Sequence, residues 1–223
     1  MKPAFWLERW ETNRIGFHQR DINPLLRAHW NRVKAPPHAK VFVPLCGKSR
    51  DMLWLHARGY QVLGVEFIRI ALQDFFRESG LTPNVSARAP FERWEANGLS
   101  LWHGDFFDLT AADLEGVGAV YDRASLIALP TDMRRRYVDK MASILPPDAE
   151  ILLITLTYPE GEMNGPPFSV ADAEVRALFA AHFHIERLGT QDALGQSGHL
   201  RERGLTQLAE RAYRIHRKRA GQA

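Results

Sequence analysis

The sequence contains little cysteine and no long apolar run. Its one cysteine, Cys46, excludes an internal disulfide and a zinc cluster built on cysteines. No stretch approaches the roughly 18 consecutive apolar residues that a membrane-spanning helix needs. The first ten residues, MKPAFWLERW, carry charge where a signal peptide needs an apolar segment. We therefore expect a soluble, cytoplasmic protein without a membrane partner.

Glycine is scarce where a phosphate would require it. The expected strand 41–44 runs into a turn, LCGKS at 45–49, that ends like a phosphate-binding loop. Such a loop has a further glycine five positions before the last one, but Phe42 stands there, and Pro44 has no N–H group to offer. The G-x-G-x-x-G turn of dinucleotide-binding proteins is missing as well. These absences disfavour a phosphate or pyrophosphate ligand.

Metal-binding and nucleophile patterns are absent too. The nine histidines show no metal-ligand spacing. Cys46 has no recognisable arrangement of histidine and carboxylate that would activate it. We predict no bound metal and a buried, unreactive Cys46.

Positive charge is concentrated at the end of the chain. The net charge is +3 and the pI is near 9.2. Five cationic residues lie between 211 and 219, which leaves residues 1–210 with a net charge of −2. No basic groove with interleaved aromatic residues occurs elsewhere. The pattern favours a solvated basic tail over residues 211–223 and argues against a nucleic-acid partner.

Strand and helix signals alternate along the chain, which is typical of an α/β domain with a mostly parallel sheet and helices on both faces. The expected strands are 41–44, 61–67, 99–103, 119–122 and 150–158, followed by two more near 184–188 and 205–215. The expected helices are 24–33, 49–58, 70–79, 132–145 and 170–181. At this length we expect residues 1–223 to form a single domain.

In such a sheet, ligands bind beyond the carboxyl ends of the strands. Glu66, at the end of the second expected strand, follows Gly47 by 19 residues. An acidic residue at this spacing accepts hydrogen bonds from both hydroxyls of a ribose. Asp105 and Phe106, after the next strand, are placed to contact an adenine. Because phosphate is disfavoured, these residues favour S-adenosylmethionine over a dinucleotide.

Several motifs, in order along the chain, carry a resemblance to a known family. They are FWLERW at 5–10, IGFH at 15–18, PLCGKSRD at 44–51, GVE at 64–66, GDFFDL at 104–109, YDRA at 121–124 and GPPF at 165–168. Together they resemble the thiopurine S-methyltransferase family, above all its bacterial members. The resemblance implies a Rossmann-like class I methyltransferase fold with a seven-stranded sheet, and S-adenosyl-L-methionine as the methyl donor.

The resemblance also implies roles for individual residues. The residues implied to bind the donor are Trp10, Leu45, Glu66, Asp105, Phe106 and Arg123. Phe17 and Phe168 resemble walls of the acceptor pocket. Each assignment has a structural alternative, because Trp10, Phe17 and Phe106 can be ordinary core aromatics. Arg123 can likewise be a structural partner of Asp122 or Asp105.

Methyl transfer is an in-line displacement, so the protein mainly has to position a soft nucleophile. An aromatic or heterocyclic thiol is largely ionised near neutral pH, so a cation that favours the thiolate can replace a strong base. Arg123 is the first candidate for this catalytic role, ahead of Arg201 and Arg203. Because the turn after the first strand offers few contacts, we expect residues 1–35 to form a helical lid over the donor.

The sequence thus predicts an S-adenosylmethionine-dependent enzyme that methylates the sulfur of a small aromatic or heterocyclic thiol, with selenium or tellurium compounds as further acceptors. One alternative is a related methyltransferase with a halide or thiocyanate acceptor. Another is a non-catalytic nucleoside-binding module. Nothing in the sequence requires more than a monomer.

Overall fold

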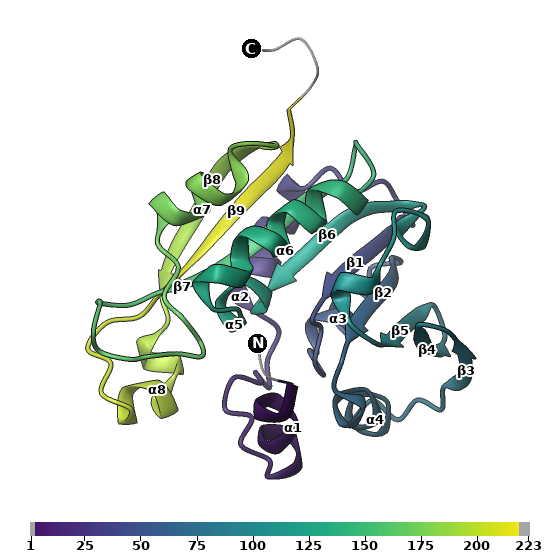
Figure 1. The fold of residues 1–223 in the computed structure, drawn as a ribbon, viewed down its shortest axis with the longest axis horizontal. Coiled ribbons are helices and arrows are strands. Elements are labelled where there is room, and N and C mark those ends of the chain that lie inside the picture. Colours follow the sequence, from purple (N-terminus) through teal and green to yellow (C-terminus); the bar gives the residue numbers. More distant parts are fainter. Residues whose placement is uncertain (1–2, 219–223) are drawn as a thin grey trace.

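A nine-stranded sheet runs through the middle of the structure (Figure 1). In the computed structural model, which describes residues 3–218, the strands follow the order β3-β4-β5-β2-β1-β6-β7-β9-β8. The central run β5-β2-β1-β6-β7 is parallel, and the outer pairs are antiparallel. The expected α/β architecture is therefore confirmed. The expected count of seven strands is wrong, because the sheet has nine.

The elements have the following bounds. The strands are β1 (Lys40–Pro44), β2 (Gln61–Glu66), β3 (Asn84–Arg88), β4 (Phe91–Ala96), β5 (Leu99–His103), β6 (Val117–Arg123), β7 (Glu150–Thr157), β8 (Phe183–Asp192) and β9 (Ala209–Arg217). The helices are α1 (Pro3–Glu11), α2 (Pro24–His29), α3 (Asp51–His56), α4 (Arg69–Glu78), α5 (Ser125–Ala128), α6 (Thr131–Ile144), α7 (Asp172–Phe179) and α8 (Gly198–Glu202).

The two unexpected strands, β3 and β4, extend the sheet beside β5. Residues Asn97 and Gly98 join β4 to β5 with positive φ angles of 48° and 80°, and Ala96 pairs directly with Leu99. A two-residue connection with both φ angles positive is the hairpin turn that matches the twist of the strands, and Asn-Gly is its preferred sequence. The residues of β3 are mostly exposed, so no apolar run marks this strand.

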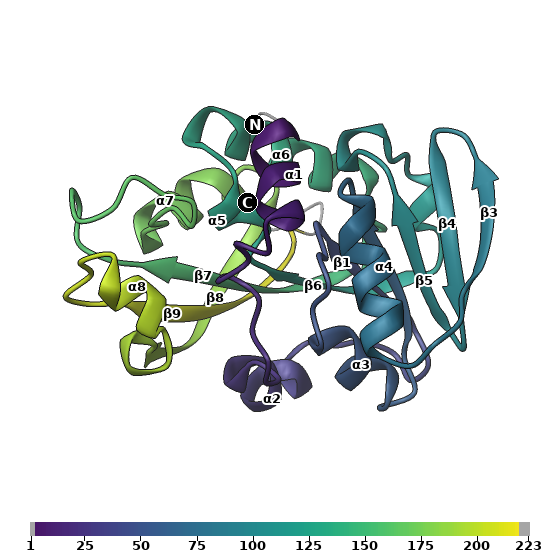
Figure 2. The ribbon, with the colours of Figure 1, turned by 90° about the horizontal axis from the view of Figure 1, so that it is seen from below.

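Side chains of the central strands alternate between two cores. In β1, Val41 and Val43 pack with the helices α2, α3 and α4, whereas Phe42 packs on the other face with α5, α6 and α7. Figure 2 shows α5, α6 and α7 on one side of the sheet and α2 and α3 on the other. Because successive side chains of a strand point to opposite faces, the same short apolar runs contribute to both hydrophobic layers.

The ends of the described chain differ in their surroundings. Helix α1 lies beyond the carboxyl ends of the central strands, between α8 and α4 (Figures 1 and 2). At the other end, Arg211, Arg214 and Arg217 belong to β9. The Arg214 guanidinium pairs with the carboxylate of Glu150 at 2.6 Å. The expected basic tail therefore does not begin at residue 211, and residues 219–223 lie outside the described residues.

No helix within residues 3–218 combines the length and the apolar character needed to cross a membrane.

Candidate active site

A cleft opens where the central parallel strands end. From β1 the chain moves outward to β2 and later returns to β6 on the other side, so the strand order reverses between β1 and β6. Ligands of such sheets bind at this reversal. The cleft has an open volume of about 880 Å³. Its lining includes Trp6, Arg9, Trp10, Phe17, His18, Leu45, Gly47, Lys48, Glu66, Arg123, Ala124, Ile127, Pro166 and Pro167.

Two residues that line the cleft adopt the left-handed backbone conformation although neither is a glycine. Leu45 follows β1 with φ +46°, and Ala124 follows β6 with φ +75°. Such conformations are costly for residues with a side chain and are concentrated at functional sites. Gly47 also has a positive φ of 51°, and a Cβ atom there would lie 3.5 Å from the ring of Trp10. The turn therefore brings backbone close to the cleft.

Lys48 does not extend an unpaired charge from this turn. Its Nζ atom pairs with Glu78 at 2.7 Å and with Asp74 at 3.3 Å, both on α4. The side chain is buried and lies 5.9 Å from the centre of the Trp10 ring. The lysine thus ties the turn to α4, in agreement with the argument that this turn is not a phosphate grip.

Glu66 closes β2 and faces the cleft. Its Oε2 accepts a hydrogen bond from the Gly47 amide, and its Oε1 accepts one from the Ile68 amide, each at 2.9 Å. Burial raises the pKa of Glu66 from 4.5 to about 7, although backbone donors act in the opposite direction. Each carboxylate oxygen keeps a further lone pair for a ligand. This arrangement suits the two hydroxyls of a ribose.

A second cavity, with an open volume of about 520 Å³, adjoins the first and shares Leu45, Glu66 and Phe67 with it. Asp105 and Phe106 both line it. The Phe106 ring packs against Tyr137 at 4.8 Å between centroids, and Asp105 accepts a hydrogen bond from the Phe107 amide at 2.9 Å. Phe106 is therefore both a core aromatic and a cavity wall.

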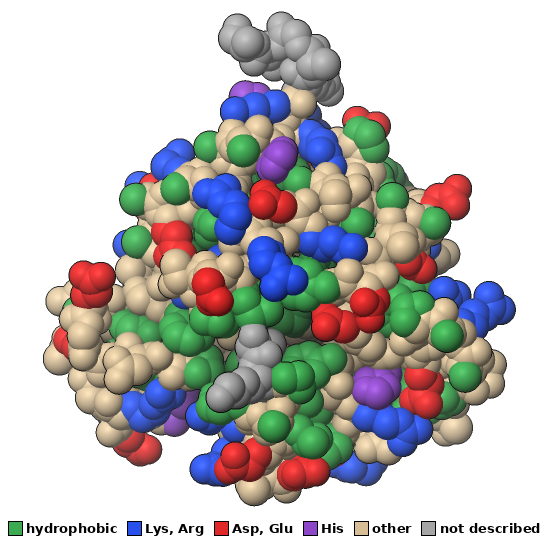
Figure 3. Space-filling view, in the orientation of Figure 1, with side chains coloured by type: hydrophobic (Ala, Val, Ile, Leu, Met, Phe, Trp, Pro, Cys, Tyr) green, Lys and Arg blue, Asp and Glu red, His purple; other side chains and the backbone are tan. Residues whose placement is uncertain are grey.

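Helix α1 covers the first cavity. Trp6, Arg9 and Trp10 line it from this helix. Phe17, in the following loop, meets both tryptophan rings edge to face, at 5.5 Å from Trp6 and 5.9 Å from Trp10. Figure 3 shows hydrophobic side chains gathered across the middle of this face, between α6 and α1. Trp10 and Phe17 therefore belong to an aromatic cover as well as to the cavity wall.

Arg123 ends β6 and is held by Asp51. Its Nε donates to Oδ2 of Asp51 at 3.0 Å, and its Nη2 donates to the Ser49 hydroxyl at 3.4 Å. The structural partner of Arg123 is thus Asp51, and the alternatives considered from the sequence do not apply. Asp122 instead accepts a hydrogen bond from the Tyr137 hydroxyl at 2.6 Å.

A third cavity, with an open volume of about 1530 Å³, extends from the cleft toward α8 and β9. The residues common to the first and third cavities are Phe17, His18, Arg123, Ala124, Ile127 and Pro167. A group bound in one cavity meets a group bound in the other at this junction. Arg123 and His18 are its polar side chains.

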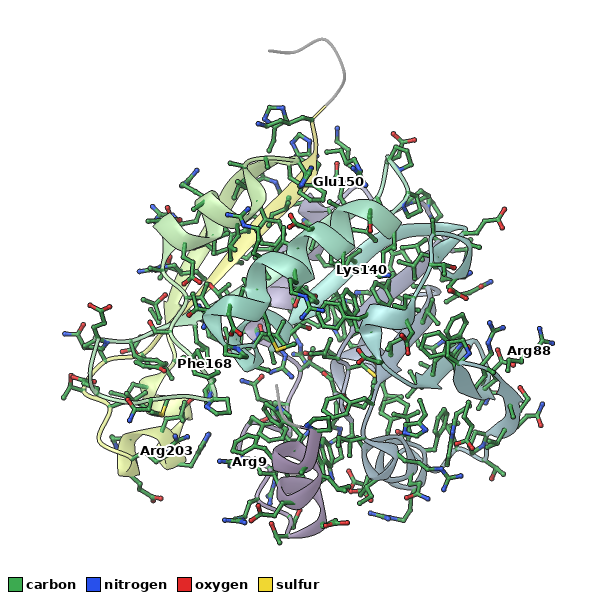
Figure 4. All side chains as sticks on the ribbon, in the orientation of Figure 1. Arg9, Arg88, Lys140, Glu150, Phe168 and Arg203 are labelled. Carbon is green, nitrogen blue, oxygen red and sulfur yellow. The ribbon has the colours of Figure 1, made fainter. Side chains whose placement is uncertain are left out.

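Not every residue expected at the site lies there. Phe168 lines none of the three cavities described above, and its ring packs against the Arg134 guanidinium at 5.5 Å. Arg203 donates to the Pro166 carbonyl at 3.4 Å from the surface, and Arg201 is exposed on α8. In Figure 4, Arg203 lies beside α8 and Arg9 on the neighbouring α1, with Phe168 nearer α6.

Sequence reasoning assigned no role to several residues of the site. His18, Pro166 and Pro167 line the junction or the cleft, yet they come from loops whose position depends on tertiary packing. Each lies within a motif that carried the family resemblance, beside Phe17 or Phe168. That adjacency is the signal that could have found them. Asp51 also lies in such a motif, directly after the turn.

The topology, the acidic end of β2 and the glycine-poor turn after β1 define a class I S-adenosylmethionine-dependent methyltransferase. A solved 1,6-didemethyltoxoflavin-N1-methyltransferase of Burkholderia thailandensis, with bound 1,6-didemethyltoxoflavin and S-adenosylhomocysteine, is 15% identical, with a TM-score of 0.61 over 96% of this chain and 86% of that chain. A Thiobacillus denitrificans methyltransferase in complex with S-adenosylhomocysteine is 14% identical, with a TM-score of 0.60 over 98% and 99% of the two chains. These similarities confirm the class I fold.

The chain belongs to the thiopurine S-methyltransferase family, whose model, "Thiopurine S-methyltransferase (TPMT)", matches residues 1–218. A thiopurine S-methyltransferase of Pseudomonas fluorescens is 51% identical over 215 residues, covering 96% of this chain and 99% of the relative. One of Nitrosospira multiformis is 49% identical over 210 residues, covering 94% and 96%. The protein is therefore an enzyme of this type with S-adenosylmethionine as methyl donor, and the non-catalytic alternative is set aside.

Proposed function

We propose that the enzyme transfers the methyl group to the sulfur of a small aromatic or heterocyclic thiol, with selenium and tellurium compounds as further acceptors. The observation that carries the proposal is the junction of the first and third cavities. Phe17, Ile127 and Pro167 give it apolar walls, and Arg123 supplies a fixed cation. A flat apolar ring with one ionisable, polarisable atom is the ligand that such a lining favours.

The donor occupies the first two cavities in this proposal. Glu66 accepts hydrogen bonds from the ribose, and Asp105 and Phe106 flank the adenine in the second cavity. Leu45 brings its backbone to the nucleoside. Trp10 lies over the methionine portion, where an aromatic face favours the positive sulfonium. The support for these roles is that all five residues line the two connected cavities.

The donor supplies an electrophilic methyl carbon on a sulfonium sulfur. The protein's residues then have to hold the acceptor sulfur about 3 to 3.5 Å from that carbon, in line with the bond that breaks. Arg123 favours the ionised acceptor through its guanidinium, which Asp51 orients at 3.0 Å. Phe17 and Pro167 limit the directions from which a ring can approach. Positioning and charge stabilisation together lower the barrier.

Residues 1–35 act as the lid in this proposal, and α1 is the part of it that covers the first cavity. Trp6 and Trp10 would shield the reacting groups from water, which strengthens the electrostatic effect of Arg123. Because all these contacts come from one chain, we propose that the active unit is a monomer. Size-exclusion chromatography with light scattering tests the monomer directly.

An acceptor panel tests the proposed reaction. With labelled S-adenosylmethionine, we expect aromatic and heterocyclic thiols to be methylated at least about tenfold faster than the corresponding alcohols, since oxygen is the harder and less polarisable nucleophile. Selenols, tellurite, iodide and thiocyanate complete the panel. Preference for iodide or thiocyanate over every thiol would contradict the proposal and support the halide alternative.

A further inference from the structure

His18 lies at the place where donor and acceptor meet, but the proposed function gives it no part. We propose that His18 is the proton acceptor for thiols that are still protonated at neutral pH. The inference rests on the proposed thiol acceptor and extends the range of substrates to weakly acidic thiols. Arg123 suffices for acceptors that arrive as thiolates, whereas His18 serves those that arrive with an S–H bond.

Position is the first argument. The six residues common to the first and third cavities include His18 and Arg123 as their polar side chains. An arginine guanidinium stays protonated and cannot take a proton. His18 is therefore the junction side chain able to act as a base. Within residues 3–218, His18 donates a hydrogen bond from its backbone amide to the Ile15 carbonyl, and its ring nitrogens have no protein partner, so the imidazole is available to a ligand.

The other acidic or basic groups near the cleft either lie outside the junction or are already engaged. Asp21, His199 and Glu210 line the third cavity but not the first. Asp51 accepts from Arg123, Tyr121 and the Asn23 amide. Glu66 accepts from two backbone amides. Burial raises the pKa of the Cys46 thiol well above its ordinary value, and Cys46 does not line the third cavity. None of these groups combines a place at the junction with a free basic atom.

Burial and the neighbouring cations both favour the neutral ring of His18. Burial is the main cause that lowers its pKa from 6.5, and the cations Lys48, Arg123 and Arg50 act in the same direction. Glu78 on α4 opposes them, but its carboxylate is paired with Lys48. Lys48 and Arg50 lie in the turn after β1, and Arg123 ends β6. A neutral imidazole at physiological pH is the form that accepts a proton.

The step balances as follows. The acceptor S–H bond breaks as a ring nitrogen of His18 takes the proton, and the sulfur electron pair forms the new S–CH₃ bond. The bond between that methyl carbon and the sulfonium sulfur breaks, and its electron pair stays on the donor sulfur. The products are a methyl thioether, S-adenosylhomocysteine and an imidazolium. The three nearby cations destabilise this imidazolium, which therefore returns its proton to water.

Two acceptors and one variant test the proposal. Benzylthiol is protonated at pH 7, whereas 4-nitrothiophenol is ionised. For His18→Gln at pH 7, we expect kcat on benzylthiol to fall about 100-fold, because a positioned general base typically contributes about 100-fold or more. On 4-nitrothiophenol we expect a fall of less than about threefold. Because both rates come from one preparation, any partial loss of folded protein cancels in their ratio.

Further readouts distinguish a base from a structural residue. The wild-type kcat on benzylthiol should fall as the pH drops below the His18 pKa, and added imidazole should partly restore the rate of the smaller His18→Ala variant. S-adenosylhomocysteine affinity should stay unchanged, and His182→Gln, at an exposed histidine that lines none of the three cavities, should match wild type. Equal losses on both thiols would overturn the proposal. Failure of wild type on both thiols would refute the proposed function instead.

Discussion

The Nε atom of Arg123 donates a hydrogen bond over 3.0 Å to Oδ2 of Asp51, which joins the end of β6 to the first residue of α3. The Tyr121 hydroxyl donates to the same oxygen at 2.8 Å. The backbone amide of Asn23 donates to the other carboxylate oxygen, Oδ1, at 2.9 Å. Burial is the largest single influence and opposes the charge on Arg123, but Asp51, Tyr121 and Glu210 together outweigh it and raise the pKa of the guanidinium. The carboxylate thus holds together the cation, the turn after β1 and the part of the N-terminal segment that contains Asn23.

Asp51→Asn should destabilise the fold strongly. The change leaves the buried Arg123 charge without its counter-ion, and breaking such a pair typically costs about 3 to 5 kcal/mol. Tyr121→Phe removes one hydrogen bond to the same carboxylate and should cost only about 1 kcal/mol. Urea unfolding monitored by circular dichroism measures both changes. Similar losses for the two variants would show that the Arg123–Asp51 pair is not what holds this region.

Glu66→Gln should weaken binding of S-adenosylhomocysteine at least about tenfold, because hydrogen bonds to a charged acceptor are worth about 1.5 to 3 kcal/mol each. Isothermal titration calorimetry gives the affinity. Glu95→Gln, at an exposed residue of β4, is the matched control and should bind like wild type. Unchanged affinity in Glu66→Gln would contradict the proposal that Glu66 binds the ribose.

Donor binding should also depend on pH through Glu66. Its pKa of about 7 means that the carboxyl is half protonated near neutrality, whereas two donating hydroxyls favour the carboxylate. Binding below pH 7 must then release a proton, so affinity should fall between pH 8 and pH 6, approaching about tenfold per pH unit below the pKa. Titrations in buffers of different ionisation enthalpy detect the proton. The dependence should disappear in Glu66→Gln.

The effect of Glu66 on folding stability has the opposite sign. Its pKa is raised from 4.5 to about 7, so without ligand the native state holds the proton more tightly than the unfolded chain. The contribution of this group is therefore fully present below pH 4.5 and is lost as the pH rises to about 7. Over this window, Glu66→Gln should flatten the dependence of the melting temperature on pH. A dependence identical to that of wild type would argue against the raised pKa.

The parallel core and the hairpin show what local sequence can predict. Strands such as β1 and β7 are short apolar runs whose two faces are both buried, and glycine or proline marks where neighbouring elements stop, so they were found within a few residues. Strand β3 is mostly exposed and lacks this signal. The Asn97-Gly98 turn did carry a signal for the β4–β5 hairpin. Strand β3 is therefore hard to predict because few of its residues are buried. Strand β4 is predictable only from the Asn-Gly turn that joins it to β5.

The site was predictable to the extent that strand ends determine it. Glu66 and Arg123 each end a strand of the parallel run, and the topology brings such ends together. Pro167 and His18 lie in loops more than 100 residues apart, and only tertiary packing places both at the junction. Phe168 shows the reverse case: it was expected in the acceptor pocket, but the described structure packs it against Arg134.

Substitutions at two positions of α1 test whether this helix contributes to donor binding. Trp10 is buried against the Gly47 turn, whereas Leu7 on α1 is 41% exposed. Trp10→Leu should weaken S-adenosylmethionine binding about tenfold, since it removes an aromatic contact with the sulfonium of roughly 0.5 to 2 kcal/mol and opens the cover to water. Leu7→Ala should leave the affinity within about twofold, because a single exposed side chain contributes little.

Removal of the whole cover extends this comparison. A chain that begins at residue 20 lacks α1 and Phe17 but keeps the Asn23 amide that donates to Asp51. We expect it to remain folded by circular dichroism and to lose most of its donor affinity in calorimetry. Native affinity in the truncated chain would mean that Glu66 and the glycine-poor turn hold the donor by themselves, and that the aromatic residues of the N-terminal segment serve only the core.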